Sequence, residues 1–144
     1  MGGGGGGSGI SSSDMSKLQQ AADERLRSLA SNSSKVLFVC EEIDRSSLEA
    51  HIVDSHVFRK DRISLLDSSR AGDADGLIES STFLVVFTDA ATNTRFLDAV
   101  IDKALVKKMG SVHVKSRARS VIPSKVTAYR WRSITWAELE EIFR

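Results

Sequence analysis

Acidic and hydroxyl side chains follow three short apolar runs of the chain, at the points where buried strands would end. They are Glu41 and Glu42 after VLFVC, Asp67 after ISLL, and Thr88 and Asp89 after FLVVF. Carboxylates clustered around one acceptor are what magnesium-assisted phosphoryl transfer needs. The same groups would also line a ligand-binding edge, and the Gly- and Asp-rich stretch after Asp67 would serve as a loop that contacts another protein.

The elements that would position these groups alternate between strands and helices. Strands are predicted at 36–40, 63–66 and 83–87, with further extended stretches at 112–114 and within 120–131, and helices over 41–56, 93–109 and 136–143. This alternation predicts an α/β, flavodoxin-like three-layer domain around a central, mostly parallel sheet of about five short strands. Because ligands bind such sheets at the carboxyl ends of the strands, the polar residues would share one edge.

Core positions follow from the same patterns. In 41–56, the residues expected to face the core are Ile43, Leu48, Ile52 and Val53. In 93–109, the apolar stripe comprises Phe96, Leu97, Val100, Ile101, Ala104 and Leu105. Val85 and Val86 lie in the middle of FLVVF and are predicted to be buried on opposite faces, because side chains alternate along a strand. Thr135 or Ser133 is the predicted cap of the last helix.

The N-terminal part differs in composition from the rest. Residues 1–13, MGGGGGGSGISSS, predict a flexible leader, because glycine and serine at this density cannot repay the backbone entropy of folding. Asp14 is a candidate N-cap for an amphipathic helix that runs to about Ala30, and 14–34 are assigned to this helix and its linker. Residues 35–144 are predicted to form a single domain.

Composition excludes several classes of site. The single cysteine, Cys40, excludes an internal disulfide framework and a cysteine-rich zinc site, and it is predicted to be a small buried core residue. His51 and His56 are five residues apart, which does not align them on one helix face, so no metal site is predicted. His113 is likewise expected at the surface or the edge of the core. No apolar run approaches the roughly 20 residues of a membrane span, and a cytoplasmic setting is predicted.

Charge is unevenly distributed along the chain. Residues 1–100 carry ten Lys/Arg against fifteen Asp/Glu, a net of −5, whereas residues 101–144 carry ten against four, a net of +6. Such asymmetry indicates either a basic face for phosphates, acidic lipid or an acidic partner, or a solvated basic edge, which we prefer. The alternating charges of HVKSRARS and YRWR are typical of an edge strand, and no nucleic-acid motif accompanies them.

A phospho-receiver domain is one interpretation of the acidic edge. Glu41 and Glu42 would supply magnesium ligands, Asp67 would be the acceptor, and Thr88 and Lys125 would be the switch hydroxyl and lysine. The spacing argues against it, because a receiver has an extra strand and helix between its acidic pair and its acceptor. Only 26 positions separate Glu41 from Asp67, and one βαβ unit takes about 30 residues. A degenerate receiver remains an alternative.

Three regions of the chain, in their order, resemble a divergent Toll/interleukin-1 receptor (TIR) domain over residues 35–144. They are KVLFVCEEIDRSSLEAHIV, then ISLLDSSRAGDADGLIESSTFLVVFTDAATNTRFLDAVI, then VIPSKVTAYRWRSITWAELEEIF. The second region departs from the family in being short, so its helix would be reduced to about one turn. Ala71 stands near the place of a frequent loop proline, and Phe96 near that of a tryptophan.

The resemblance implies a cytoplasmic signalling module of the innate-immune type, which acts by TIR–TIR self-association as a homo-oligomer or by binding an adaptor. Its partners would be other TIR-domain proteins or itself. The implied contact loop is Arg70, Ala71, Gly72, Asp73, Ala74, Asp75 and Gly76.

The resemblance also raises an enzymatic alternative, because some TIR domains cleave NAD with a glutamate one helical turn past the aromatic position. Alignment on Phe96 places Val100 there, while Asp98 and Asp102 lie on other faces of the helix. No catalytic residue, cofactor or metal ligand is therefore predicted, and NAD hydrolysis is kept as an alternative function.

Overall fold

The structure is a computed structural model that describes residues 17, 20, 24, 27, 28, 30, 34–107, 109–116 and 132–144. Its strands are β1 (Val36–Cys40), β2 (Ile63–Asp67), β3 (Phe83–Thr88), β4 (Gly110–Lys115) and β5 (Arg132–Ile134). They form one parallel sheet in the order β2-β1-β3-β4-β5. This order is that of the flavodoxin-like fold, so the predicted fold class is confirmed. The extended stretch predicted within 120–131 lies outside the described residues.

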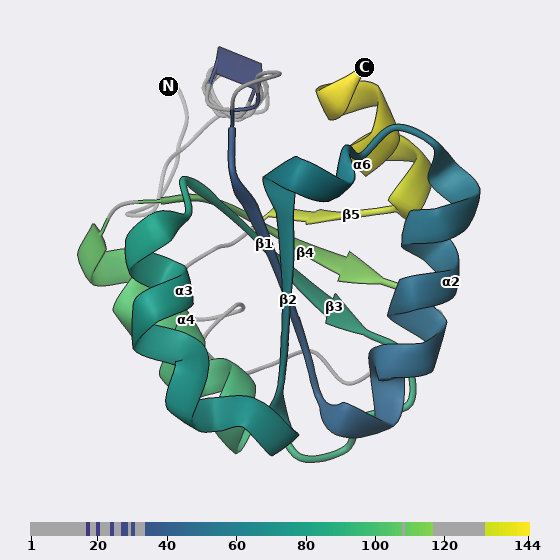
Figure 1. The fold of residues 1–144 in the computed structure, drawn as a ribbon. Coiled ribbons are helices and arrows are strands. Elements are labelled where there is room, and N and C mark those ends of the chain that lie inside the picture. The colour runs from purple at the N-terminus through teal and green to yellow at the C-terminus, as the bar shows by residue number, and fades with distance from the viewer. Residues whose placement is uncertain are drawn as a thin grey trace, which may run out of the picture.

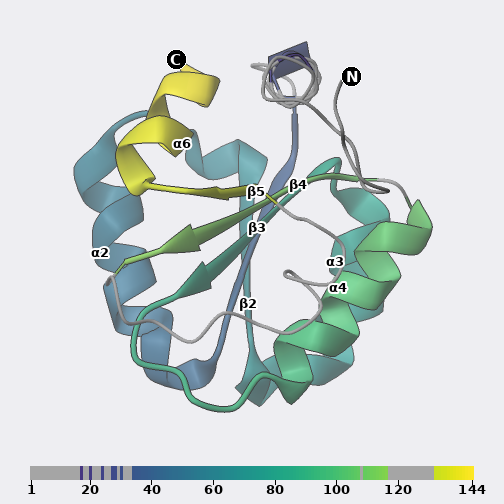
Figure 2. The same ribbon diagram turned by 180° about the vertical axis from the view of Figure 1, so that it is seen from behind.

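Helices cover both faces of the sheet, as its continuous apolar strands require. They are α2 (Arg45–Ser55), α3 (Ala74–Ser80), α4 (Arg95–Lys107) and α6 (Trp136–Phe143). Figures 1 and 2 show α2 and α6 on one face and α3 and α4 on the other. Short 3-10 helices occupy Glu42–Asp44, Lys60–Arg62 and Ser68–Asp73. The described N-terminal residues 17, 20, 24, 27 and 28 are helical, as predicted.

Two hydrophobic clusters lie on either side of the sheet. Phe38, Val85 and Phe87 pack beneath α2 and α6, whereas Val39 and Val86 pack beneath α3 and α4. Val85 and Val86 are both fully buried, on opposite faces, as the alternation along FLVVF predicts. Cys40 is buried as predicted, and burial together with the nearby charge of Asp67 raises the pKa of its thiol to about 12.

The inner face of α2 differs from the sequence prediction. Ile43 and Val53 were expected in the core, but they are 69% and 65% exposed. The helix begins only at Arg45, so Ile43 lies in the preceding 3-10 turn, and Val53 is rotated away from the face that carries Leu48. The half-buried His51 takes the inner position instead, with its ring 5.1 Å from the Trp136 ring of α6.

The last helix begins where the sequence predicts. Thr135 is the N-cap of α6, and its hydroxyl accepts a hydrogen bond from the Glu138 backbone N–H at 3.2 Å. The Glu138 carboxylate accepts in turn from the Thr135 N–H at 3.2 Å, which completes a capping box. Within the described part of the chain, none of the helices has the length and apolarity that a membrane span requires.

Candidate functional site

The polar residues that the sequence places at one edge do lie at the carboxyl ends of neighbouring strands. Cys40 at the end of β1 pairs with Asp67 at the end of β2, which brings Glu41 and Glu42 beside the segment after Asp67. Thr88 ends β3 on the other side of β1, and Asp89 follows it. The edge therefore lies at the carboxyl end of β1, with the end of β2 on one side and the end of β3 on the other.

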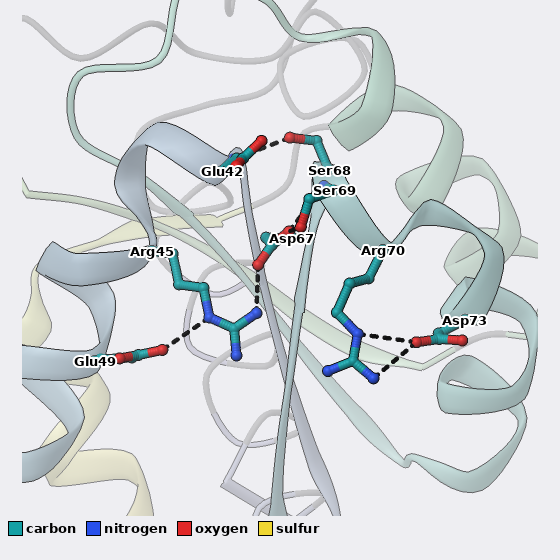
Figure 3. A network of polar contacts seen from close by, with 8 residues as sticks. All are labelled: Glu42, Arg45, Glu49, Asp67, Ser68, Ser69, Arg70 and Asp73. Atoms are coloured by element: carbon teal, nitrogen blue, oxygen red, sulfur yellow. Dashed lines mark hydrogen bonds and ion pairs between the residues drawn. The ribbon is translucent and has the colours of Figure 1, made fainter.

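The carboxylate of Asp67 accepts hydrogen bonds from neighbouring residues (Figure 3). Its carboxylate accepts from Arg45 Nη1, from the Ser69 hydroxyl, and from the Ser69 backbone N–H at 2.8 Å. Burial alone would raise the pKa of Asp67, but the hydrogen bonds from Ser69 and Arg45 outweigh burial and hold the pKa below its usual value. A carboxylate that is 2% exposed and bound in this way is a poor phosphate acceptor.

Arg45 links this buried carboxylate to the surface of α2. Its Nε donates to Glu49 at 2.8 Å while its Nη1 donates to Asp67. The hydrogen bond to Glu49, followed by that to Asp67, raises the pKa of the guanidinium. Arg45 is therefore held in one orientation at the side of β2.

Asp44 closes the space between β1 and β3. Its carboxylate accepts from the backbone N–H of Asp89 at 3.0 Å and from that of Ala90 at 2.7 Å, and it is 1% exposed. Ligands of flavodoxin-like domains bind at this switch point of the sheet. Here the chain's own carboxylate takes the backbone donors that would otherwise hold an anion. Sequence analysis did not single out Asp44, and no motif marks it.

Glu41 and Ser68 connect the segments that follow β1 and β2. The Glu42 N–H donates to Ser68 Oγ at 2.9 Å, and Glu41 is almost fully buried beside them. Burial raises the pKa of Glu41, against a hydrogen bond from Ser68, and the nearby charge of Asp44 raises the pKa further. The segments after β1 and β2 are therefore joined by a hydrogen bond.

Histidine 113 is buried, contrary to the prediction of a surface or core-edge residue. It lies on β4, which is an interior strand because β5 pairs with its outer side. His113 Nε2 is 2.8 Å from Thr88 Oγ1 and its Nδ1 is 3.3 Å from Ser133 Oγ. Burial, together with the charge of Lys115, lowers the pKa of His113 to about 4. The histidine is thus neutral at pH 7 and joins three strands by side-chain hydrogen bonds.

The predicted contact loop is largely helical. Ser68–Asp73 is 3-10 helical with a kink at Arg70, whose backbone is not helical, and α3 begins at Ala74, within the predicted loop. The seven-residue α3 is also longer than the single turn that the resemblance implied. Ala74, the first residue of α3, is buried, whereas the other six predicted contact residues are exposed: Arg70, Ala71, Gly72, Asp73, Asp75 and Gly76.

An open groove of about 720 Å³ runs beside β2, the edge strand of the sheet. It is lined by Arg45, Ser64, Leu65, Arg70, Gly72, Asp73, Gly76 and Leu77. Four of these residues belong to the contact segment that the sequence predicts. The other four come from α2, β2 and α3, and sequence analysis did not connect them with the site, because their proximity depends on the fold.

The residues considered for other chemistry lie elsewhere. Val100 of α4 is fully buried against the sheet, while the half-buried Asp98 accepts from Thr94 Oγ1 at 3.4 Å. Asp102 is exposed, and neither aspartate lines the groove. Lys125, the lysine of the receiver interpretation, lies outside the described residues. Over the residues that the structure covers, no three His, Cys, Asp or Glu side chains gather as metal ligands would.

No protein-family model matches the chain, and a search of curated proteins gives no significant match.

Proposed function

We propose that the chain is a TIR-like protein-interaction module of cytoplasmic, innate-immune-type signalling. It acts by self-association with a second copy or by binding an adaptor that carries a TIR domain. The observation that supports this most is the groove beside β2, where Arg70, Gly72, Asp73 and Gly76 of the predicted contact segment line an open surface. Such a surface can receive a partner without rearrangement of the fold.

The state of the carboxyl edge favours binding over catalysis. Asp44 and Asp67 already accept hydrogen bonds from the chain itself, and both are buried. A catalytic carboxylate must instead reach the reacting atoms of a substrate. The exposed residues of this region gather on the contact segment, where a protein partner would meet them.

Replacement of Arg70 by alanine tests this proposal. Arg70 is 60% exposed and pairs with the exposed Asp73 at 3.1 Å, so the variant should keep its stability within about 0.5 kcal/mol. We expect Arg70→Ala to weaken self-association, measured by analytical ultracentrifugation, or adaptor capture in a pull-down.

Arg59→Ala is the matched control. Arg59 is 65% exposed and pairs with the exposed Asp61 at 3.4 Å, but it does not line the groove. Self-association and adaptor binding that are unchanged in Arg70→Ala, or reduced equally in Arg59→Ala, would contradict the proposal.

A further inference from the structure

Among the described residues, no strand lies beside the outer edge of β2. β2 is last in the strand order and pairs there with β1 alone. In a strand with one neighbour, alternate residues direct their N–H and C=O groups away from that neighbour, where a further strand can bind them. Ser64 and Leu65 in the middle of β2 are half-buried and line the groove. The groove therefore contains an available strand edge.

Two guanidinium groups flank this edge. Figure 3 shows Arg45 reaching toward β2 from α2 on one side and Arg70 from the 3-10 helix Ser68–Asp73 on the other. Arg45 uses Nε and Nη1 for Glu49 and Asp67, and Arg70 uses Nε and Nη2 for Asp73. Within the described part of the chain, Nη2 of Arg45 and Nη1 of Arg70 have no acceptor. Each of these nitrogens carries two N–H donors.

The rest of the groove suits an extended chain. Leu65 and Leu77 give it an apolar part, and a Cβ added at Gly72 or Gly76 would meet nothing within 4 Å. Side chains of an extended segment point alternately to opposite sides. Leu65 packs on the α2 face of the sheet and Leu77 on the α3 face. Side chains on one side of the segment would therefore meet Leu65 and Arg45, and those on the other side would meet Leu77 and Arg70.

We propose that this groove binds an extended acidic segment of a partner protein. The segment adds a strand to the edge of β2, and the carboxylate of an Asp or Glu side chain binds Arg70 on the α3 side of that edge. The inference rests on the proposed function, since it specifies what the interaction surface receives. Arg70 can turn to the new carboxylate because its pair with Asp73 is exposed on both sides. Arg45 is already held in place by the buried Asp67.

A designed peptide tests the chemistry directly. The probe is acetyl-Thr-Val-Thr-Glu-Val-Thr-Val-amide, with two counterparts in which the central Glu is Gln or Lys. Each is titrated into the nitrogen-15-labelled full chain up to millimolar concentration. We expect the Glu peptide to cause saturable chemical-shift changes at the amides of Ser64, Leu65 and Gly76. The Gln peptide should bind about tenfold more weakly and the Lys peptide should not bind, because a guanidinium group binds a carboxylate more strongly than a neutral or cationic side chain.

Filling the groove should abolish binding without damage to the fold. Gly76→Leu places a side chain into the open space, and leucine favours a helix more than glycine does, so the thermal midpoint should stay or rise. Affinity for the Glu peptide should fall at least tenfold. Glu79→Leu adds the same side chain to an exposed position of α3 outside the groove and should leave binding unchanged. Arg70→Gln should remove the preference for Glu over Gln.

Three results would overturn the inference: no saturable shift at millimolar peptide, equal binding of the Lys peptide, or unchanged binding by Gly76→Leu. The two arginines would then be charges that prevent β2 from pairing with other chains. The proposed function is judged separately. If peptide binding fails but Arg70→Ala still weakens self-association, only the acidic-strand inference is lost. If the peptide binds but Arg70→Ala leaves self-association and adaptor capture intact, the proposed function is lost.

Discussion

His113 shows how a single buried side chain links stability to pH. Its folded-state pKa of about 4 lies below the ordinary value of 6.5, so the unfolded chain binds a proton in this window that the native state does not. Stability should therefore fall as the pH is lowered from about 6.5 to about 4, by about 3 kcal/mol in all if no other group intervened. Urea unfolding at several pH values measures this decline.

His113→Gln is the variant that isolates this contribution, because glutamine can still hydrogen-bond Thr88 and Ser133 but does not titrate. We expect its stability to vary less between pH 6.5 and pH 4. Asp67 affects stability at lower pH. Because its pKa is lowered in the folded state, its contribution to stability is lost only as the pH falls below its ordinary pKa of 3.8. The pKa of Glu41 is raised in the folded state, so its protonation would increase stability as the pH falls, opposite to the effect of His113. A decline of equal slope in His113→Gln would assign the effect to other groups.

Asp44 is the second residue whose removal should be costly. Without its buried carboxylate, the N–H groups of the half-buried Asp89 and the exposed Ala90 lose their acceptor. Asp44→Ala should lower the free energy of unfolding by about 1–3 kcal/mol, measured by urea denaturation. Asp73→Ala, at an exposed aspartate, should change it by less than about 0.5 kcal/mol. Equal effects of the two substitutions would mean that these hydrogen bonds contribute little.

At the scale of elements, Lys107 of α4 holds the end of α3. Its Nζ donates to the carbonyl oxygens of Ile78, Glu79 and Ser81 at 2.6, 2.6 and 2.7 Å. The Ile78 carbonyl also accepts from the Ser81 N–H at 3.2 Å, so Lys107 adds to the cap at the end of α3. A cation there also meets the negative end of the helix dipole. Lys107→Met should reduce stability by about 1–2 kcal/mol and speed amide hydrogen exchange in α3.

Lys103→Met on the same helix is the matched control for Lys107→Met. Lys103 pairs with Asp75 at 2.5 Å, but both side chains are exposed, so its loss should change stability by less than about 1 kcal/mol. Faster exchange throughout α3 in the Lys103 variant alone would show that the side-to-side ion pair, and not the end cap, fixes this helix.

The sequence predicts the elements well where the signal is local. VLFVC and FLVVF are continuous apolar runs, and Thr135 with Glu138 is a capping box, so β1, β3 and the start of α6 agree with prediction. The start of α3 does not, because the Gly- and Asp-rich residues before it are those of turns. There the Asp67 side chain caps the 3-10 helix by accepting from the Ser69 N–H, which no local pattern indicates.

For the whole molecule, the sequence predicts which polar residues share an edge of the sheet. It does not predict which of them form hydrogen bonds or ion pairs with other parts of the chain. The charge of Asp67 is paired with Arg45 from another element, and His113 lies on an interior strand because β5 pairs with β4. These outcomes depend on contacts between segments 20 or more residues apart. The groove has the same origin, since it needs α2, β2 and α3 together.

The distribution of carboxylates over the molecule also bears on NAD cleavage, which the resemblance left as an alternative. A carboxylate must face the ribose to stabilise its developing positive charge, and such groups are typically worth about 3–4 kcal/mol, or 100- to 1000-fold in rate. Val100 of α4 stands at the implied position, but it is buried and carries no carboxylate that could stabilise this charge. We therefore expect purified protein incubated with a high concentration of NAD to release no more nicotinamide than a blank.

Asp98 and Asp102 are the residues that would contradict this expectation. Asp98 is half-buried and bonded to Thr94, and Asp102 is exposed on α4, which covers the face of the sheet opposite α2. Turnover that disappears in Asp98→Ala or Asp102→Ala would make the chain an enzyme and would place its site on α4. Turnover that survives both substitutions would point to a contaminant, because no other carboxylate lies near the implied position on that helix.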